Sequence, residues 1–120
     1  MNWTSTAAIL LALAVILGAF GAHGLRARLD AESMLVYETA VMYHFLNALG
    51  ILILSVVART GATSPAGMKT VCAILLAGVV LFSGSLYLLA VTGVRILGAI
   101  TPLGGLLFIG GWLLAAWRLR

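Results

Sequence analysis

Four long apolar runs divide this 120-residue sequence, and each is about as long as a helix that crosses a lipid bilayer. They cover approximately residues 4–24, 36–58, 69–92 and 97–117. The connections between them carry charged or turn-forming residues, in RARLDAES, ARTGATSPAGMK and TGVR. Lipid cannot satisfy exposed backbone groups, so each run is predicted to be a helix, and short connections make neighbours antiparallel. The predicted fold is therefore all-α: a polytopic membrane protein with one domain over residues 1–120, built as an antiparallel four-transmembrane-helix bundle.

The composition excludes a soluble domain and indicates that the lipid bilayer surrounds the chain. Hydrophobic residues make up 63% of the sequence and charged residues 8%, whereas soluble domains carry roughly 25% charged residues. The net charge of +4 comes from basic residues scattered near the gaps between spans, so nucleic acid is not an expected partner. Cys72 is the single cysteine, and we expect it to be a small packing residue without a disulfide or zinc partner.

The beginning of the sequence and the first connection have separate predictions. The first run is interpreted as a retained span, because no Lys or Arg precedes Arg26 and the run stays apolar for about 19 residues, unlike a signal peptide. Asp30 is predicted to cap a helix that runs from about Ala31 to about Val57. That length exceeds the thickness of the hydrocarbon, so a short interfacial connection is expected between the first two helices.

The fourth run contains Thr101-Pro102, which leaves two alternatives. Thr101 either caps a short helix with proline at its first position, or lies in a longer helix that is kinked there. We favour the short helix, with RILGAI as a partly irregular segment before it.

Small residues at helical spacing predict close packing between helices on three of the spans. They are Ala14, Gly18, Gly21 and Ala22 on the first span, Ala73, Ala77 and Gly84 on the third, and Gly104, Gly111 and Ala115 on the fourth. A homo-oligomer or another membrane protein as partner stays open. Trp3, Trp112 and Trp117 lie near span ends on the side of the termini and are interpreted as interfacial aromatic residues.

Polar residues inside the spans gather toward the end of the bundle opposite the termini, and they predict a one-sided polar pocket. The candidate ligand-binding residues are His23, Glu38, Tyr43, His44, Asn47, Tyr87, Arg95 and Thr101. A helical wheel places Tyr43, His44 and Asn47 on one face of the second helix, with Tyr37 and Ser55, whereas Glu38 points nearly the opposite way. The other half of the bundle is expected to be almost purely apolar.

Each candidate also has a purely structural interpretation. An interfacial ion pair is favoured for Glu38 and Arg95, with Arg26 and Arg28 as further partners for Glu38. A capping or loop hydrogen bond is favoured for His23.

For residues deeper in the bundle, the structural and functional interpretations are weighted differently. His44 with Asn47 is balanced between the two, because polar side chains well inside a span must find partners. Helix-to-helix hydrogen bonds are favoured for Ser83, Ser85 and Tyr87.

Enzyme chemistry is not expected. HExxH, CxxC, GxSxG and P-loop spacings do not occur in the sequence, and two histidines on different spans with one glutamate make too weak a set for a metal site. No catalytic residue, metal or cofactor is predicted.

The segments GAFGAHGL, ETAVMYHFLNALG, FSGSLYLLAVTG and LGAITPLGG, in this order, resemble an uncharacterised family of small integral membrane proteins. This family is domain of unknown function 423, and its eukaryotic relatives include transmembrane protein 256. The resemblance extends from about Ala12 to Trp117 and implies four spans, no established biochemical activity, and a bacterial inner membrane or, for some relatives, mitochondria. His23 and the Thr101-Pro102 step match the family pattern. That pattern often has histidine where this chain has Asn47, which argues against a two-histidine metal or proton site.

The sequence therefore predicts a non-enzymatic membrane protein that binds or helps to move a small polar ligand, ion or lipid headgroup through the polar pocket. The alternative is a structural or assembly partner of another membrane protein, acting through the Gly/Ala faces. Basic residues number four on the side of the termini and three on the other side. This bias, together with the lack of a transit-like leader, predicts a multi-pass protein of a bacterial inner membrane with both termini in the cytoplasm.

Overall fold

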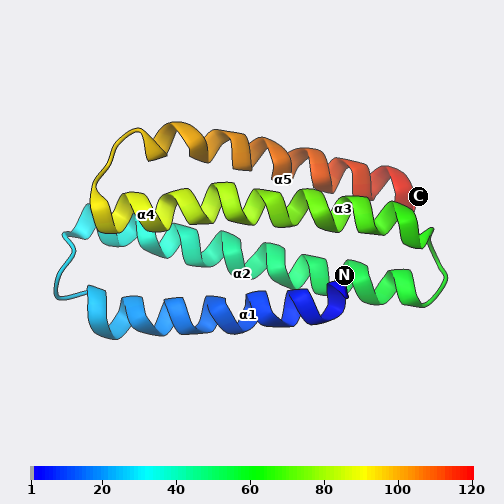
Figure 1. Ribbon diagram of the computed structural model, residues 1–120, viewed down its shortest axis with the longest axis horizontal. Coiled ribbons are helices and arrows are strands. Elements are labelled where there is room, and N and C mark those ends of the chain that lie inside the picture. The colour runs from blue at the N-terminus through cyan, green and yellow to red at the C-terminus, as the bar shows by residue number, and fades with distance from the viewer. Residues whose placement is uncertain (1) are drawn as a thin grey trace.

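The structure is a computed structural model that describes residues 2–120, and four antiparallel helical spans make up almost all of it (Figure 1). The first span is α1 (Trp3–Phe20) followed by the π-helical turn η1 (Gly21–Leu25), and the second is α2 (Ala31–Arg59). The third combines α3 (Pro65–Gly78), the π-helical turn η2 (Val79–Ser83) and α4 (Gly84–Thr92), and the fourth is α5 (Leu97–Leu119). The four spans are long and apolar enough to cross a membrane, so the predicted fold class is confirmed.

The spans alternate in direction, which places the three connections at the expected ends. The N-terminus, the α2–α3 connection and the C-terminus lie together at one end of the bundle, hereafter the terminus end (Figure 1). The α1–α2 and α4–α5 connections lie at the opposite end (Figure 1). The second span has 29 residues, which corresponds to about 43 Å of helix, close to the full 48 Å length of the molecule.

Large apolar side chains cover the outside of the bundle, as expected for a surface that contacts lipid acyl chains. Ile9, Leu106 and Leu113 on the outer helices are 62%, 64% and 66% exposed. The interior is narrow and is packed in two clusters, a larger one toward the terminus end around Ile51 and Leu75 and a smaller one at the opposite end. Apolar side chains therefore cover the lipid-facing surface and also fill the core.

Side-chain caps stabilise the first turn of three of the helices. Asp30 accepts from the backbone N–H of Ser33 at 2.7 Å and so caps α2, as predicted. This N–H, together with the hydrogen-bonding Ser33 side chain, lowers the pKa of the Asp30 carboxyl below its ordinary value of 3.8. The side chain of Asn2 caps α1, and Ser64 caps α3 with proline at the first position.

Packing follows the order of the chain. α1 packs chiefly against α2, α2 also packs against the third span, and the third span packs against α5. The last two spans approach each other closely at Gly104, where a Cβ would overlap the backbone of Phe82. Gly93 ends the third span in the left-handed region at φ +73°, a conformation that glycine adopts without steric penalty.

Two predictions about helix geometry are wrong. The last helix begins at Leu97, with Pro102 inside it, and not at Thr101 after an irregular segment. The backbone hydrogen bonds of its first turn run to the residue three positions earlier, as from the Gly98 N–H to the carbonyl of Arg95 at 3.0 Å. Pro102 cannot donate a backbone bond and its ring crowds the preceding turn, but bonds from each N–H to the carbonyl three residues earlier keep the start of α5 helical.

The second wrong prediction concerns the small residues of the third span. Ala73 and Ala77 are exposed, and the buried face carries Val71, Cys72 and Leu75 instead. On the first span Ala14 and Gly21 are buried, but Ala22 is exposed. The predicted close-packing face of the fourth span is confirmed, because Gly104, Gly111 and Ala115 are all buried.

Candidate functional site

Polar side chains within the bundle, some of them fully buried, join α2 to the third and fourth spans. We call this group the polar belt, and its members are His44, Asn47, Ser83, Ser85, Tyr87, Thr101 and Trp112. Four of these side chains are at least nine-tenths buried, namely His44, Asn47, Ser83 and Ser85. Polar groups at this depth must find protein partners, because lipid offers none.

A polar contact between α2 and α4 is made by His44 and Tyr87. Nδ1 of His44 lies 2.8 Å from the Tyr87 hydroxyl oxygen. The ring of Tyr87 also packs against Tyr37 at 5.3 Å between centroids, and the Tyr37 hydroxyl donates to the backbone carbonyl of Leu17 on α1 at 2.6 Å. The aromatic hydroxyls therefore connect three spans. Nε2 of His44 is buried without a hydrogen-bond partner among residues 2–120.

Asn47 uses both ends of its amide. Nδ2 donates to the carbonyl of Tyr43 at 2.9 Å, and Oδ1 accepts from the indole N–H of Trp112 at 2.9 Å. Trp112 is therefore not simply an interfacial aromatic residue, since it ties α5 to α2. Its ring fills the space beside Gly50, where a Cβ would overlap it.

Serine hydroxyls make the remaining contacts of the belt. Ser83 donates to the carbonyl of Ala40 on α2 at 2.8 Å. Ser85 and Thr101 share a hydrogen bond of 2.7 Å between α4 and α5. The predicted helix-to-helix hydrogen bonds of Ser83, Ser85 and Tyr87 are thus confirmed.

The other candidate residues lie outside the belt. Glu38 is paired with Arg26 at 3.3 Å on the surface, which confirms the interfacial ion pair expected for Glu38. Arg95 is exposed in the α4–α5 connection and has no carboxylate within ion-pair distance in the described chain. Tyr43 is 37% exposed, and its ring packs on Phe82 at 4.6 Å between centroids.

His23 lies in η1 with its side chain exposed. The capping or loop hydrogen bond expected for it is not formed by any of residues 2–120. The structure therefore brings His44, Asn47, Tyr87 and Thr101 into one belt and leaves His23, Glu38 and Arg95 on the surface of the opposite end.

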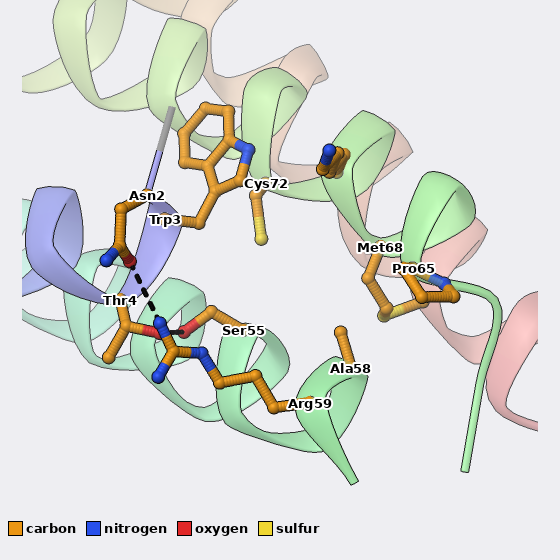
Figure 2. Close-up of a pocket in the computed structure, with 10 residues that line it drawn as sticks. Asn2, Trp3, Thr4, Ser55, Ala58, Arg59, Pro65, Met68 and Cys72 are labelled. Atoms are coloured by element: carbon orange, nitrogen blue, oxygen red, sulfur yellow. Dashed lines mark hydrogen bonds between the residues drawn. The ribbon is translucent and has the colours of Figure 1, made fainter. Parts of the chain in front are cut away.

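A cavity of ≈ 420 Å³ opens at the terminus end, on the side of the bundle that was expected to be almost purely apolar (Figure 2). We call it the terminus-side cavity. The beginning of α1, the last turns of α2 and the first turns of α3 enclose it (Figure 2). Its lining residues are Asn2, Trp3, Thr4, Ser55, Ala58, Arg59, Pro65, Met68, Lys69 and Cys72.

Two side-chain hydrogen bonds link α1 to α2 beside this cavity. Arg59 donates from Nη2 to Oδ1 of Asn2 at 3.2 Å, and the hydroxyls of Thr4 and Ser55 lie 3.0 Å apart (Figure 2). The apolar wall comes from Trp3 and from Met68 on α3 (Figure 2). The cavity thus has a cationic, hydrogen-bonding rim above an apolar interior, which suits an amphiphilic ligand.

Sequence reasoning misses this cavity because each lining residue has an ordinary role at a helix end. Arg59 and Lys69 read only as markers of orientation, and Trp3 as an interfacial aromatic residue. Ser55 offers a signal, since it shares the polar face of α2 with His44 and Asn47 but lies near the terminus end. A polar residue there needs a partner, and Thr4 provides it.

Two further cavities lie at the opposite end and share the ion pair. One of ≈ 250 Å³ lies between α1 and α2, and one of ≈ 440 Å³ lies beside the α1–α2 connection; both are lined by Arg26 and Glu38. Of the eight candidate residues, only Glu38 lines any of these three cavities.

The described residues do not contain a group of three His, Cys, Asp or Glu side chains able to hold a metal ion. Cys72 is a free, buried thiol in the wall of the terminus-side cavity.

The four apolar spans make this chain a small polytopic α-helical membrane protein. Its interior contains the polar belt, and cationic residues line the terminus-side cavity. The chain belongs to the family described as "Protein of unknown function (DUF423)", whose model matches residues 17–105. The resemblance noted in the sequence is therefore confirmed.

Curated relatives support the same family. The chain is 52% identical over 97 residues to a UPF0382 membrane protein of Staphylococcus haemolyticus, covering 81% of this chain and 77% of that protein. It is 47% identical over 106 residues to the UPF0382 membrane protein YwdK of Bacillus subtilis, covering 85% and 82%. A UPF0382 membrane protein of Staphylococcus aureus is 40% identical over 102 residues, covering 85% and 81%. No solved structure matches the chain.

Proposed function

We propose that this protein is a non-enzymatic binding protein that holds the polar head of a membrane amphiphile in the terminus-side cavity. The observation that carries the proposal is the cavity itself, ≈ 420 Å³ in volume, with hydrogen-bonding groups and cations above an apolar interior. Ligand sites commonly combine an apolar wall with a few polar groups.

The polar belt is a less suitable binding site than the terminus-side cavity. His44, Asn47, Ser85 and Thr101 make hydrogen bonds with one another's helices, so much of their bonding capacity is used within the bundle. Groups at the rim of the cavity are more available, because Lys69 is exposed and the Arg59–Asn2 bond lies on an exposed surface. A ligand at the cavity would therefore displace fewer buried bonds than one at the belt.

Filling the cavity tests this function. Ala58→Leu adds bulk at a lining residue without changing charge, and Ala77→Leu adds the same bulk on an exposed face of the third span. In neutral detergent, a bacterial polar lipid extract should raise the midpoint of thermal unfolding of the unmodified protein and of Ala77→Leu. The rise should be absent for Ala58→Leu. Equal rises for all three proteins would contradict the proposal.

A second candidate is a structural or assembly role, in which the protein acts with another membrane protein or with a second copy of itself. The observation that favours it is the exposed small-residue face of the third span, where Ala73 and Ala77 lie outside the bundle, since such faces allow close helix contacts. In this case Ala77→Leu should abolish co-purification of the partner, whereas Ala58→Leu should leave it intact. The reverse result would favour the binding role.

We also propose that the protein lies in a bacterial inner membrane with both termini in the cytoplasm. It is supported by the terminus end, which carries Arg59, Lys69, Arg118 and Arg120, because basic residues are enriched on the cytoplasmic side.

A further inference from the structure

We infer that the terminus-side cavity selects an anionic, phosphate-bearing lipid headgroup, with Arg59 and Lys69 as its two charged ligands. This inference rests on the proposed function and names the chemistry of the ligand. The first support is the distribution of charge in the folded chain. The second is the hydrogen bond from Arg59 to Asn2.

The charge at the terminus end has no carboxylate side chain to balance it. The sequence has three acidic residues, Asp30, Glu32 and Glu38. All three lie at or near the beginning of α2, at the opposite end of the bundle (Figure 1). Arg59 and Lys69 therefore face the cavity without an acidic side chain from the protein. An anion from the membrane surface would supply the missing counter-charge.

Helix ends reinforce this potential. The first residues of α1 and α3, Trp3 and Pro65, line the cavity, so the positive ends of two helices lie beside it. The end of α2, with Ala58, contributes the opposite partial charge, which the cation of Arg59 in its last turn offsets. The guanidinium of Arg118 also lies against Gly67 in the first turn of α3.

The hydrogen bond between Arg59 and Asn2 defines how the headgroup would be held. A neutral amide oxygen occupies one donor of the guanidinium at 3.2 Å. A phosphate accepts from arginine through charge-assisted bonds, which are about twice as strong as bonds between neutral groups. The headgroup therefore displaces Asn2 from Arg59, contacts Lys69 from the other side, and leaves its acyl chains along the apolar wall and the lipid-facing surface.

Lipid retention measured by native mass spectrometry tests the inference, with the full chain in a neutral detergent that contains equal amounts of phosphatidylglycerol and phosphatidylcholine. The unmodified protein should retain phosphatidylglycerol in preference. Arg59→Gln/Lys69→Gln should weaken its retention about 30-fold, since each basic residue near an anionic headgroup contributes roughly fivefold. Arg28→Gln/Arg95→Gln removes the same charge at the opposite end and should retain it. Equal weakening of both double variants, or of neither, would overturn the inference.

A second variant keeps the test decisive if the double substitution impairs folding. Asn2→Ser preserves a capping hydroxyl for α1 but removes the amide that holds Arg59, so phosphatidylglycerol should bind more tightly. Unchanged or weaker binding would contradict displacement of Asn2. Soluble glycerol phosphate should not compete at millimolar concentration, and effective competition would overturn the assignment to a lipid.

The outcomes separate this inference from the proposed function. If both lipids are retained alike and Ala58→Leu releases both, the cavity binds lipid without charge selection and only the inference fails. If neither lipid is retained by any form of the protein, the proposed function fails as well.

Discussion

Trp112 on α5 donates its indole N–H to Oδ1 of Asn47 on α2 at 2.9 Å, although the two residues are 65 positions apart in the chain. The other end of the same amide is held by the carbonyl of Tyr43. The Trp112 ring covers Gly50, one turn further along α2, where any larger residue would clash. This hydrogen bond links α5 directly to α2, although α5 packs chiefly on the third span.

Trp112→Phe should lower the free energy of unfolding by about 1–2 kcal/mol, because it leaves the buried amide oxygen of Asn47 without a donor. A double-mutant cycle with Asn47→Leu should give a coupling of about 0.5–1.5 kcal/mol. Reversible unfolding in mixed detergent and SDS, followed by circular dichroism, measures both values. Trp117→Phe is the control and should have little effect, since Trp117 is 59% exposed. Zero coupling between Asn47 and Trp112 would refute the bond.

Gly104→Ala should destabilise the protein by about 1–3 kcal/mol, the usual cost of adding bulk at a tight contact. The added methyl group would meet the backbone of Phe82, which cannot move aside as a flexible side chain can. Gly110→Ala on the same helix is the matched control, because nothing lies within 4 Å of the position of its Cβ. That variant should be neutral, or more stable by up to about 1 kcal/mol. Similar losses for both variants would disprove a specific contact at Gly104.

Acidification should weaken the start of α2 through Asp30. The pKa of this carboxyl is lower in the folded protein than its ordinary value of 3.8, because the ionised form accepts the Ser33 N–H. The cap therefore stabilises α2 fully above pH 3.8 and loses this contribution as the pH falls through the lower, folded-state value. Amide hydrogen exchange at Ser33, compared with the intrinsic rate at each pH, should become less protected over this range. In Asp30→Asn, which keeps a capping oxygen without a titratable group, the exchange should lack this extra acid dependence.

Single cysteines on the two connections should report opposite sides of the membrane. In a Cys72→Ser background, Val94→Cys in the α4–α5 connection should react with an impermeant thiol reagent on intact cells. Ala62→Cys in the α2–α3 connection should react only after permeabilisation, if the termini are cytoplasmic. Both native side chains are exposed. The reversed pattern would invert the orientation, and labelling of both from one side would contradict four crossings.

The spans, their directions and the Asp30 cap could be predicted because each depends on local signals. Hydropathy over about 20 residues identifies a crossing, and alternation then fixes which connections share an end. The cap requires only Asp30 and the first turn of the helix after it. Hydrogen bonds between Ser83, Ser85, Tyr87 and other helices were also predictable, because polar groups in lipid need partners.

The orientation of faces in the third span could not be predicted from a straight helix. A wheel at 100° per residue places Ala73, Ala77 and Gly84 on one face, but η2 adds a residue within Val79–Ser83, with a bond from the Gly84 N–H to the carbonyl of Val79. Such a π-helical turn rotates the helix beyond it by roughly one residue position, so Gly84 leaves the face that Ala73 and Ala77 share before the turn. The larger Val71, Cys72 and Leu75 are buried instead, and the sequence carries no clear signal for the insertion.

The polar sites were only partly predictable for a similar reason. His44, Asn47 and Tyr87 could be expected to lie in one region, but their pairing depends on the rotation of each helix about its axis. Trp112 has the ordinary signature of an interfacial residue, and nothing local indicates that it reaches Asn47. The terminus-side cavity depends on how α1, α2 and α3 diverge at their ends, which is a property of tertiary packing that hydropathy does not encode.

Because each span packs on its neighbours in the chain, the molecule can assemble in the order in which its segments leave the ribosome. An α1–α2 hairpin can form first in the bilayer, and the third span can then pack on α2. The final segment brings Trp112, the donor that the amide of Asn47 lacks until that moment. Insertion of α5 and closure of the interior would therefore coincide, so a chain truncated before α5 would expose an unsatisfied amide in the lipid and be a target for quality-control proteolysis.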